Sequence, residues 1–379
     1  MENFEGELDL GLKLKMMRLL WFQGFFVRRN IPLIKYTFGK RTTQQYTDID
    51  VLGIRFNYDF SSEKVSADCK TGGTARTAER IFWLSGVMRH FGANRGLFVR
   101  KNITENKYVD LAENLNISVL SKTMVDQLEQ SYRINPSHSF GVFNVRSIKD
   151  EEKLFRALKK DSIKIYNYLT ERFWRDTNSQ KIVSLISYGS KLSSSLGTYD
   201  KVLLFFKIYT LSLLSIAVLE FSKRFLVIPQ NQQEVQIRER LMGGRHESYE
   251  RQKLFEGFYD FMTQEIKKRY REKYPVHKVD FINQLYPEYT KYVIDIVQRL
   301  CRDPISSVYI PHILDLVAYE AILRKNSIVK DYIPNLPFHL KTSNLLKPSE
   351  DMIIFGERCN IISKDDREKI LEKLTGLRE

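Results

Sequence analysis

The sequence predicts a mixed α/β domain over residues 1–140, in which helices flank a mixed central sheet, followed by a mostly α-helical domain over residues 151–335. Strand-like and helical segments alternate before residue 140, whereas long helical patterns with few strand signals fill the next half. The chain has 379 residues, more than one ordinary core holds, so at least two domains are expected. Residues 336–379 are expected to form a C-terminal extension.

Local patterns place the segments of the α/β domain. Apolar residues recur at helical spacing between residues 8 and 23, and Gly24 ends that first helix. Short apolar runs bounded by turn residues predict strands. After the first helix, the expected order is strands at 24–33, 46–58 and 63–71, a helix at 74–91, a strand at 94–102, a helix, a strand at 117–120, and a helix that begins at Ser121 or Lys122.

The most apolar window of the chain lies in the helical half, at residues 202–221. Lys207 interrupts this window and Glu220 ends it. A membrane span needs about 20 nearly uncharged apolar residues, so a buried helix of an all-α domain is expected instead. The extension begins with prolines and ends in a helix. Ser363 is expected to cap that helix, because Asp366 follows three residues later.

The composition favours a polyanionic partner and a reducing compartment. The chain carries 60 Lys and Arg against 46 Asp and Glu, and the net charge of +14 is spread over both halves. Such a balance is typical of proteins that bind nucleic acid or an anionic membrane surface. The three cysteines form no CxxC motif, which argues against a disulfide framework or a thiolate zinc site. The acidic N-terminus does not resemble a signal peptide, so a cytoplasmic protein is expected.

Two neighbouring strands carry charged side chains where burial is expected. Their sequences read "YTDIDVLGIRF" and, after a short gap, "KVSADCKTGG". Strand side chains alternate between faces, so Asp68 and Lys70 share a face, as do Asp48 and Asp50. If the two strands form a hairpin, then Asp50, Asp68 and Lys70 converge. For Asp48, a structural or turn role is favoured.

Converging carboxylates repel each other unless a cation lies between them. Oxygen ligands without His or Cys suit magnesium or manganese. An ammonium group beside such an ion can orient a water that attacks a phosphodiester. The alternative is a surface hairpin with a cross-strand ion pair, which contributes less than about 1 kcal/mol.

The motif "DIDVLG" followed by "VSADCKTGG" resembles the PD-(D/E)xK nuclease superfamily, which includes Mrr-like restriction enzymes and Holliday-junction resolvases. The resemblance covers roughly residues 1–135, including the later helix, strand and helix that complete the core of that family. It implies a restriction-endonuclease-like fold for the N-terminal domain. It also implies hydrolysis of phosphodiester bonds with Mg²⁺ or Mn²⁺.

The resemblance assigns roles to individual residues. Asp50 would be the first metal ligand, Asp68 the second, and the backbone carbonyl of Cys69 the third, while Lys70 would position the water. Many relatives add a glutamate from the first helix. Glu7 is the candidate here, although it lies farther from the end of that helix than the family pattern leads us to expect.

Two basic regions are candidates for nucleic-acid binding. Arg76 and Arg80 stand on the helix after the triplet, where the family often carries Gln or Tyr, and they can contact phosphates. The segment at 264–278 interleaves basic residues with tyrosines, a composition able to hold a phosphate backbone and stack on bases. Its basic candidates are Lys267, Lys268, Arg269 and Arg271. For both regions, a solvated helix face is the alternative.

These observations lead to three functional hypotheses. The first is a metal-dependent endonuclease that acts on DNA, fused to a helical domain that binds substrate or a protein partner. Homodimers are common among the relatives, and the fold points by analogy to prokaryotic restriction or antiviral defence. The second is a catalytically inactive nucleic-acid-binding or assembly subunit with the same fold. The third is a nuclease directed at RNA, which these residues do not separate from the first.

Overall fold

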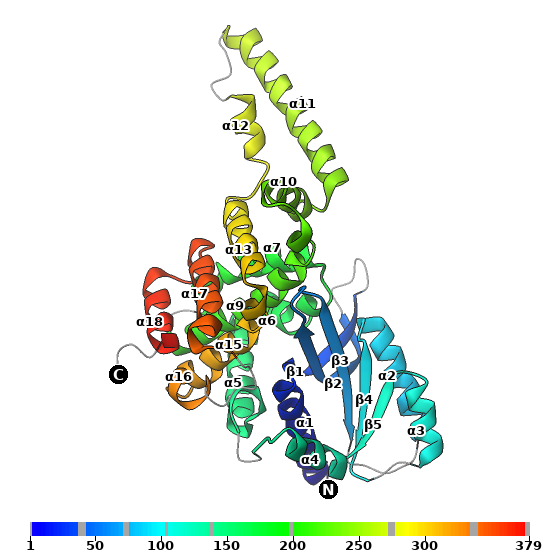
Figure 1. Cartoon of the computed structure of the whole chain (residues 1–379). Coiled ribbons are helices and arrows are strands. Elements are labelled where there is room, and N and C mark those ends of the chain that lie inside the picture. The colour runs from blue at the N-terminus through cyan, green and yellow to red at the C-terminus, as the bar shows by residue number, and fades with distance from the viewer. Residues whose placement is uncertain are drawn as a thin grey trace.

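The computed structural model describes residues 2–36, 43–70, 76–102, 105–135, 139–196, 200–271, 277–333 and 340–375. Figure 1 shows a mixed sheet with its helices at one end of the molecule and a helical half beside it. The prediction of an α/β half followed by a mostly helical half is therefore confirmed at this level.

The elements of the first half follow in this order: α1 (Glu2–Phe22), β1 (Phe26–Tyr36), β2 (Thr43–Phe56), β3 (Ser62–Lys70), α2 (Thr77–Phe91), β4 (Arg95–Arg100), α3 (Asn106–Glu113), β5 (Ile117–Ser121) and α4 (Lys122–Ser131). The second half contains η1 (Gly141–Phe143), α5 (Val145–Asp161), α6 (Ile163–Thr170), η2 (Arg172–Trp174), α7 (Asn178–Gly189), α8 (Leu192–Leu196), α9 (Asp200–Ser222), η3 (Phe225–Val227), α10 (Gln230–Leu241), α11 (Arg245–Tyr270), α12 (Lys278–Asn283), α13 (Thr290–Arg302), α14 (Pro304–Ser307), α15 (Ile310–Leu316), η4 (Val317–Ile322), α16 (Ile328–Asp331), α17 (Thr342–Arg358) and α18 (Lys364–Thr375).

The sheet has the strand order β1-β2-β3-β4-β5. Strand β2 runs antiparallel to its neighbours β1 and β3, whereas β3, β4 and β5 are parallel. The expected hairpin between the second and third strands is confirmed. Its turn is closed by the backbone N–H of Asn57, which donates to the carbonyl of Ser61 at 2.9 Å.

Helices cover both faces of the sheet. On β4, Phe98 packs with apolar residues of α2 and α3, whereas its neighbours Leu97 and Val99 join the core that includes α1. Successive strand residues point to opposite faces, so α1 and α2 lie on opposite sides. Burial on both sides explains why β4 reads as an uninterrupted apolar run instead of an alternating one.

Helix α9 forms the centre of the helical half and contacts α7, α15 and α17 (Figure 1). It is long and apolar enough to cross a membrane, but 83% of its apolar window is buried inside the protein. The expectation of a core helix at residues 202–221 is therefore confirmed. Two of its serines make local hydrogen bonds; the hydroxyl of Ser222, for example, donates to the carbonyl of Val218 at 2.7 Å. The hydroxyl of Ser212 instead donates to Asp315 on α15, at 3.1 Å.

The hydrophobic core continues across the predicted domain boundary. One cluster of buried side chains runs from Leu12 in α1 to Leu374 in α18. Arg28 on β1 also forms a buried ion pair with Asp315 on α15, at 2.6 Å. The residues described from the predicted extension belong to this body as well, because α17 packs on α13 and α15, and α18 packs on α17.

Candidate metal centre

Asp50, Asp68 and Lys70 lie together at adjacent strands of the sheet. In the antiparallel register of β2 and β3, Val51 faces Ala67, so positions 50 and 68 come next to each other. The ammonium Nζ of Lys70 is 3.5 Å from Oδ2 of Asp50. Asp50 and Lys70 both act electrostatically on Asp68. These three residues define the carboxylate cluster: Lys70 pairs with Asp50, and Asp68 lies on the adjacent strand, close enough for both charges to affect its pKa.

Asp50 is buried and surrounded by positive charge and hydrogen-bond donors. Its Oδ1 lies 2.6 Å from Nζ of Lys13, and its Oδ2 accepts a hydrogen bond from the backbone N–H of Cys69 at 2.9 Å. Burial alone would raise the pKa of Asp50. The ammonium groups of Lys13 and Lys70 and the N–H of Cys69 outweigh burial and lower this pKa below its usual value. Asp50 is thus ionised at neutral pH.

Asp68 is even less accessible, with only 1% of its side chain exposed, but its electrostatics differ. Its carboxylate accepts two hydrogen bonds from the guanidinium of Arg80 on α2, from Nε at 3.1 Å and from Nη2. Burial raises the pKa of Asp68, and the charge of Asp50 adds to this rise, while Arg80 and Lys70 oppose it. The pKa values of the two carboxyl groups therefore move in opposite directions.

Lys13 is a member of the cluster that the sequence interpretation missed. It lies on α1 with Met16, Met17 and Leu20, which are buried and follow it at helical spacing. Its side chain is 14% exposed and pairs with Asp50. A lysine on the apolar face of a helix was the available signal, because a buried ammonium needs a carboxylate opposite it.

Two further groups border the cluster. The thiol of Cys69 is fully buried, and burial together with Asp50 and Asp68 raises its pKa well above the usual value. This thiol therefore stays protonated, which leaves the backbone carbonyl as the group of Cys69 suited to a hard cation. The guanidinium of Arg100 lies over the Phe98 ring, 4.5 Å from its centroid. Burial lowers the pKa of Arg100, and Asp68 opposes that shift.

The proposed nucleic-acid-binding residues lie in different surroundings. Arg76 has a 78% exposed side chain at the start of α2, whereas Arg80 is already paired with Asp68. The four basic residues at 267–271 lie at the far end of α11, away from the sheet (Figure 1). The side chain of Glu7 lies outside the described residues, so the helix-glutamate prediction is untested.

The oxygen donors fit a magnesium-type ion. Mg²⁺ is usually bound by one or two carboxylates together with waters and substrate phosphates. Asp50, Asp68 and the carbonyl of Cys69 supply such donors. In the described part of the chain, no three His, Cys, Asp or Glu side chains gather at one point, so water and substrate would complete the coordination. An ion would also have to replace Lys13 or Arg80 at a carboxylate.

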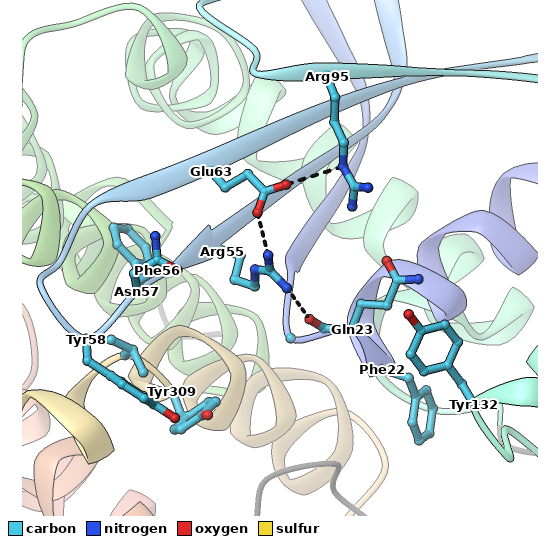
Figure 2. Close-up of a pocket in the computed structure, with 12 residues that line it drawn as sticks. Phe22, Gln23, Arg55, Phe56, Asn57, Tyr58, Glu63, Arg95, Tyr132 and Tyr309 are labelled. Carbon is cyan, nitrogen blue, oxygen red and sulfur yellow. Dashed lines mark hydrogen bonds and ion pairs between the residues drawn. The ribbon is translucent and has the colours of Figure 1, made fainter. Parts of the chain in front are cut away.

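A separate cavity of about 740 Å³ lies at the opposite end of the same strands. Figure 2 shows Glu63 between two arginines: its Oε2 accepts from Arg55 Nη2 at 2.5 Å, and its Oε1 lies 3.3 Å from Arg95 Nε. Glu63 and Arg95 stand at the starts of β3 and β4, whereas Asp68 and Lys70 stand at the end of β3. The cavity and the carboxylate cluster are therefore distinct.

Comparisons with protein-family models, curated proteins and solved structures find no match to this chain.

Proposed function

We propose that the chain is a Mg²⁺- or Mn²⁺-dependent nuclease that hydrolyses phosphodiester bonds of DNA. The observation that carries this proposal is the pair of buried carboxylates, Asp50 and Asp68, on neighbouring strands beside the ammonium of Lys70. Two nearly inaccessible carboxylates are costly unless cations compensate them. A divalent ion that is bound by both carboxylates and by a substrate phosphate would provide such compensation.

The residues of the chain would divide the work. Asp50, which is ionised, and Asp68 would hold the ion together with the Cys69 carbonyl. The bound ion would stabilise charge on the phosphoryl oxygens and favour deprotonation of water. Asp50 is only 4% exposed, whereas Lys70 is 36% exposed. The ammonium of Lys70 can therefore contact both the cluster and a substrate phosphate. It would orient the attacking water against the phosphorus.

The cationic partners would change during metal binding. Lys13 and Arg80 contact carboxylate oxygens that an ion would bind. Arg80 is 32% exposed and carries a guanidinium that suits phosphate, so it can move from Asp68 to the substrate backbone. In this proposal, Arg80 keeps its predicted role as a phosphate contact, but only after an ion has replaced it at Asp68.

The proposal is tested by cleavage assays on supercoiled plasmid, linear duplex, single-stranded DNA and RNA, with Mn²⁺ and with a chelator. We expect metal-dependent cleavage of DNA. Lys70→Ala should lower the rate at least about a hundredfold, because it removes a group that acts on the reacting water. DNA binding and the far-UV spectrum should stay close to wild type. Full activity of Lys70→Ala would contradict the assignment.

A matched pair of variants separates chemistry from folding. Asp50→Asn keeps the side-chain shape but removes the charge that holds the ion, so cleavage should be lost. Asp48→Asn makes the same change two residues earlier on β2, opposite Pro32 and outside the cluster. It should retain activity. Equal loss of activity in both variants would indicate damage to the strand and not to a metal centre.

One observation favours a second candidate function. Arg80 occupies both oxygens of Asp68, an arrangement that also suits a catalytically inactive subunit that binds nucleic acid or assembles with partners. In that case Mn²⁺ would not raise the melting temperature, while salt-sensitive DNA binding would persist. The substrate panel also separates DNA from RNA. A cytoplasmic role in prokaryotic restriction or antiviral defence belongs to the proposal by analogy of fold only.

A further inference from the structure

Helix α11 projects from the body of the protein with α12 beside it, at the top of Figure 1. It contacts α10 at its base and α12 along one side. On that side, the ring of Phe281 from α12 lies 5.8 Å from Phe255 and 5.5 Å from Tyr259, centroid to centroid. The Phe281 ring also stacks on Phe258, with 6.2 Å between centroids. Helix α12 thus covers the face of α11 around Phe255 and Tyr259 and reaches Phe258 at the border of this face. The adjoining face, which carries Leu254 and Phe261, stays open.

The open face carries an exposed apolar stripe. Leu254, Phe258 and Phe261 follow one another at spacings of four and three residues, so they lie along one side of the helix. Their exposed fractions are 71%, 55% and 57%. Large apolar side chains gathered in this way on a projecting helix mark a site of association.

Charged residues at both ends of the stripe follow a pattern that is complementary to itself. Moving along the face from the N-terminal end, Glu247 and Arg251 come before the apolar residues, and Glu265 and Lys268 come after them. The signs therefore read negative, positive, apolar, negative, positive. When a second copy of the helix lies antiparallel on this face, Glu247 meets Lys268 and Arg251 meets Glu265. In a parallel arrangement, each charge would meet its own kind.

We propose that the open face of α11 binds the same face of a second copy of this chain in antiparallel orientation. The two-fold axis would pass near Gly257 and Phe258, in the middle of the stripe. A Cβ added at Gly257 would meet no atom within 4 Å, so a partner helix can approach the backbone closely there. An isologous contact of this kind gives a closed dimer.

The same face is a poor match for nucleic acid. Helix α11 contains six Lys and Arg and five Asp and Glu, so its charges nearly cancel. A phosphate backbone needs a surplus of positive charge along the contact. The basic residues at the tip of the helix stay available beyond the paired segment. A second copy of the chain would bury the apolar residues and pair with the alternating charges.

The test is the mass of the full-length chain in solution, measured by sedimentation over a range of concentrations. We expect a species of twice the chain mass that dissociates on dilution. Phe261→Glu should shift it to the monomer, because it places a carboxylate against Leu254 of the second copy and leaves the stacking of Phe258 on Phe281 in place. The matched control is Phe82→Glu on α2, where the phenylalanine is 57% exposed on a different helix. That variant should dimerise like the wild type.

A charge exchange tests the antiparallel orientation. Glu247→Lys should weaken the dimer, because it opposes Lys268 of the second copy with a like charge. Adding Lys268→Glu should restore it. The two positions are 21 residues apart, about 30 Å along one helix, so they cannot compensate each other within a chain. A monomer at all concentrations, a dimer that survives Phe261→Glu, or failure of the exchange to restore dimerisation would overturn the proposal. Nuclease activity is not part of this readout, so the two proposals fail separately.

Discussion

His312 is a titratable side chain buried between the sheet and the helical half. It is 3% exposed and lies edge-on to Trp21 and Phe26. Burial, with a contribution from the charge of Arg28, lowers the pKa of His312 to about 4. The imidazole is therefore neutral in the folded protein at pH values where the unfolded chain, with a histidine pKa of about 6.5, already binds a proton.

This shift predicts an acid-sensitive stability. The pKa of His312 is lower in the folded than in the unfolded protein, so a falling pH favours the unfolded chain, which binds the proton more readily. The stability that neutral His312 gives the folded protein is therefore complete above about pH 6.5 and is lost as the pH falls toward 4. Between pH 7 and pH 5 we expect the free energy of unfolding to fall by roughly 2 kcal/mol through this group. Urea unfolding of wild type and His312→Gln at both pH values measures the difference.

The control for this prediction is His246→Gln, which replaces a histidine on the solvated surface. It should show the same fall in stability between pH 7 and pH 5 as the wild type. His312→Gln should show a smaller fall. If the two variants respond alike, the acid sensitivity arises elsewhere in the protein.

At the scale of single residues, the sequence predicted contacts that depend on short-range geometry. Asp50, Asp68 and Lys70 could be placed together because the alternation of strand side chains and a short hairpin turn determine their positions. Lys13 could not, because its pairing with Asp50 depends on how α1 crosses the sheet. Arg80 was assigned to phosphate, since no local pattern shows that it turns back onto Asp68.

At the scale of elements, the last helix shows a local pattern that also serves a long-range contact. Ser363 and Asp366 form the predicted capping box: the N–H of Asp366 donates to the Ser363 hydroxyl at 3.1 Å, and the N–H of Ser363 donates to Asp366 Oδ2 at 3.0 Å. The same Oδ2 lies 2.7 Å from Nζ of Lys207 on α9. The cap was predictable from spacing, whereas the partner 159 residues away was not.

This double role predicts unequal costs for substitutions in the cap. Ser363→Ala should lower the free energy of unfolding by about 1 kcal/mol through loss of a helix cap. Asp366→Ala should lower it by about 3 kcal/mol or more, because it also leaves the ammonium of Lys207 buried without its carboxylate. Urea unfolding compares both with Asp365→Ala, which changes an exposed residue of the same turn. Equal costs for Ser363→Ala and Asp366→Ala would contradict the role of Lys207.

Turn chemistry sets the start of α11. Helix α11 begins at Arg245, directly after two glycines and within a run of polar residues. Gly243 and Gly244 both have positive φ and complete the change of direction alone, so the helix starts sooner than the polar residues indicate. The exposed face of α11 had no sequence signal of its own, because an apolar stripe at helical spacing normally indicates a buried face.

At the scale of the whole molecule, the two halves share one interior. Trp21 on α1 lies edge-on to Phe140, with 5.1 Å between the ring centroids. Phe140 comes after α4, the last helix of the α/β half. The guanidinium of Arg28 on β1 forms two hydrogen bonds of 2.6 Å with Asp315 on α15. Separating the halves would expose this apolar contact and leave a buried charge unpaired, which costs several kcal/mol.

We therefore expect the chain to unfold in a single cooperative transition, although the sequence predicted separate domains. Trp83 on α2 reports on the sheet, and Trp174 reports on the helical half. Two single-tryptophan proteins can be made, each with Trp21→Phe and one further Trp→Phe substitution. Their fluorescence should give the same denaturant midpoint, because the shared core couples both probes to one event. Far-UV circular dichroism of each protein should follow the same curve. Two distinct midpoints would show that residues 1–140 fold independently and that the ion pair of Arg28 with Asp315 and the shared apolar core are too weak to join the halves.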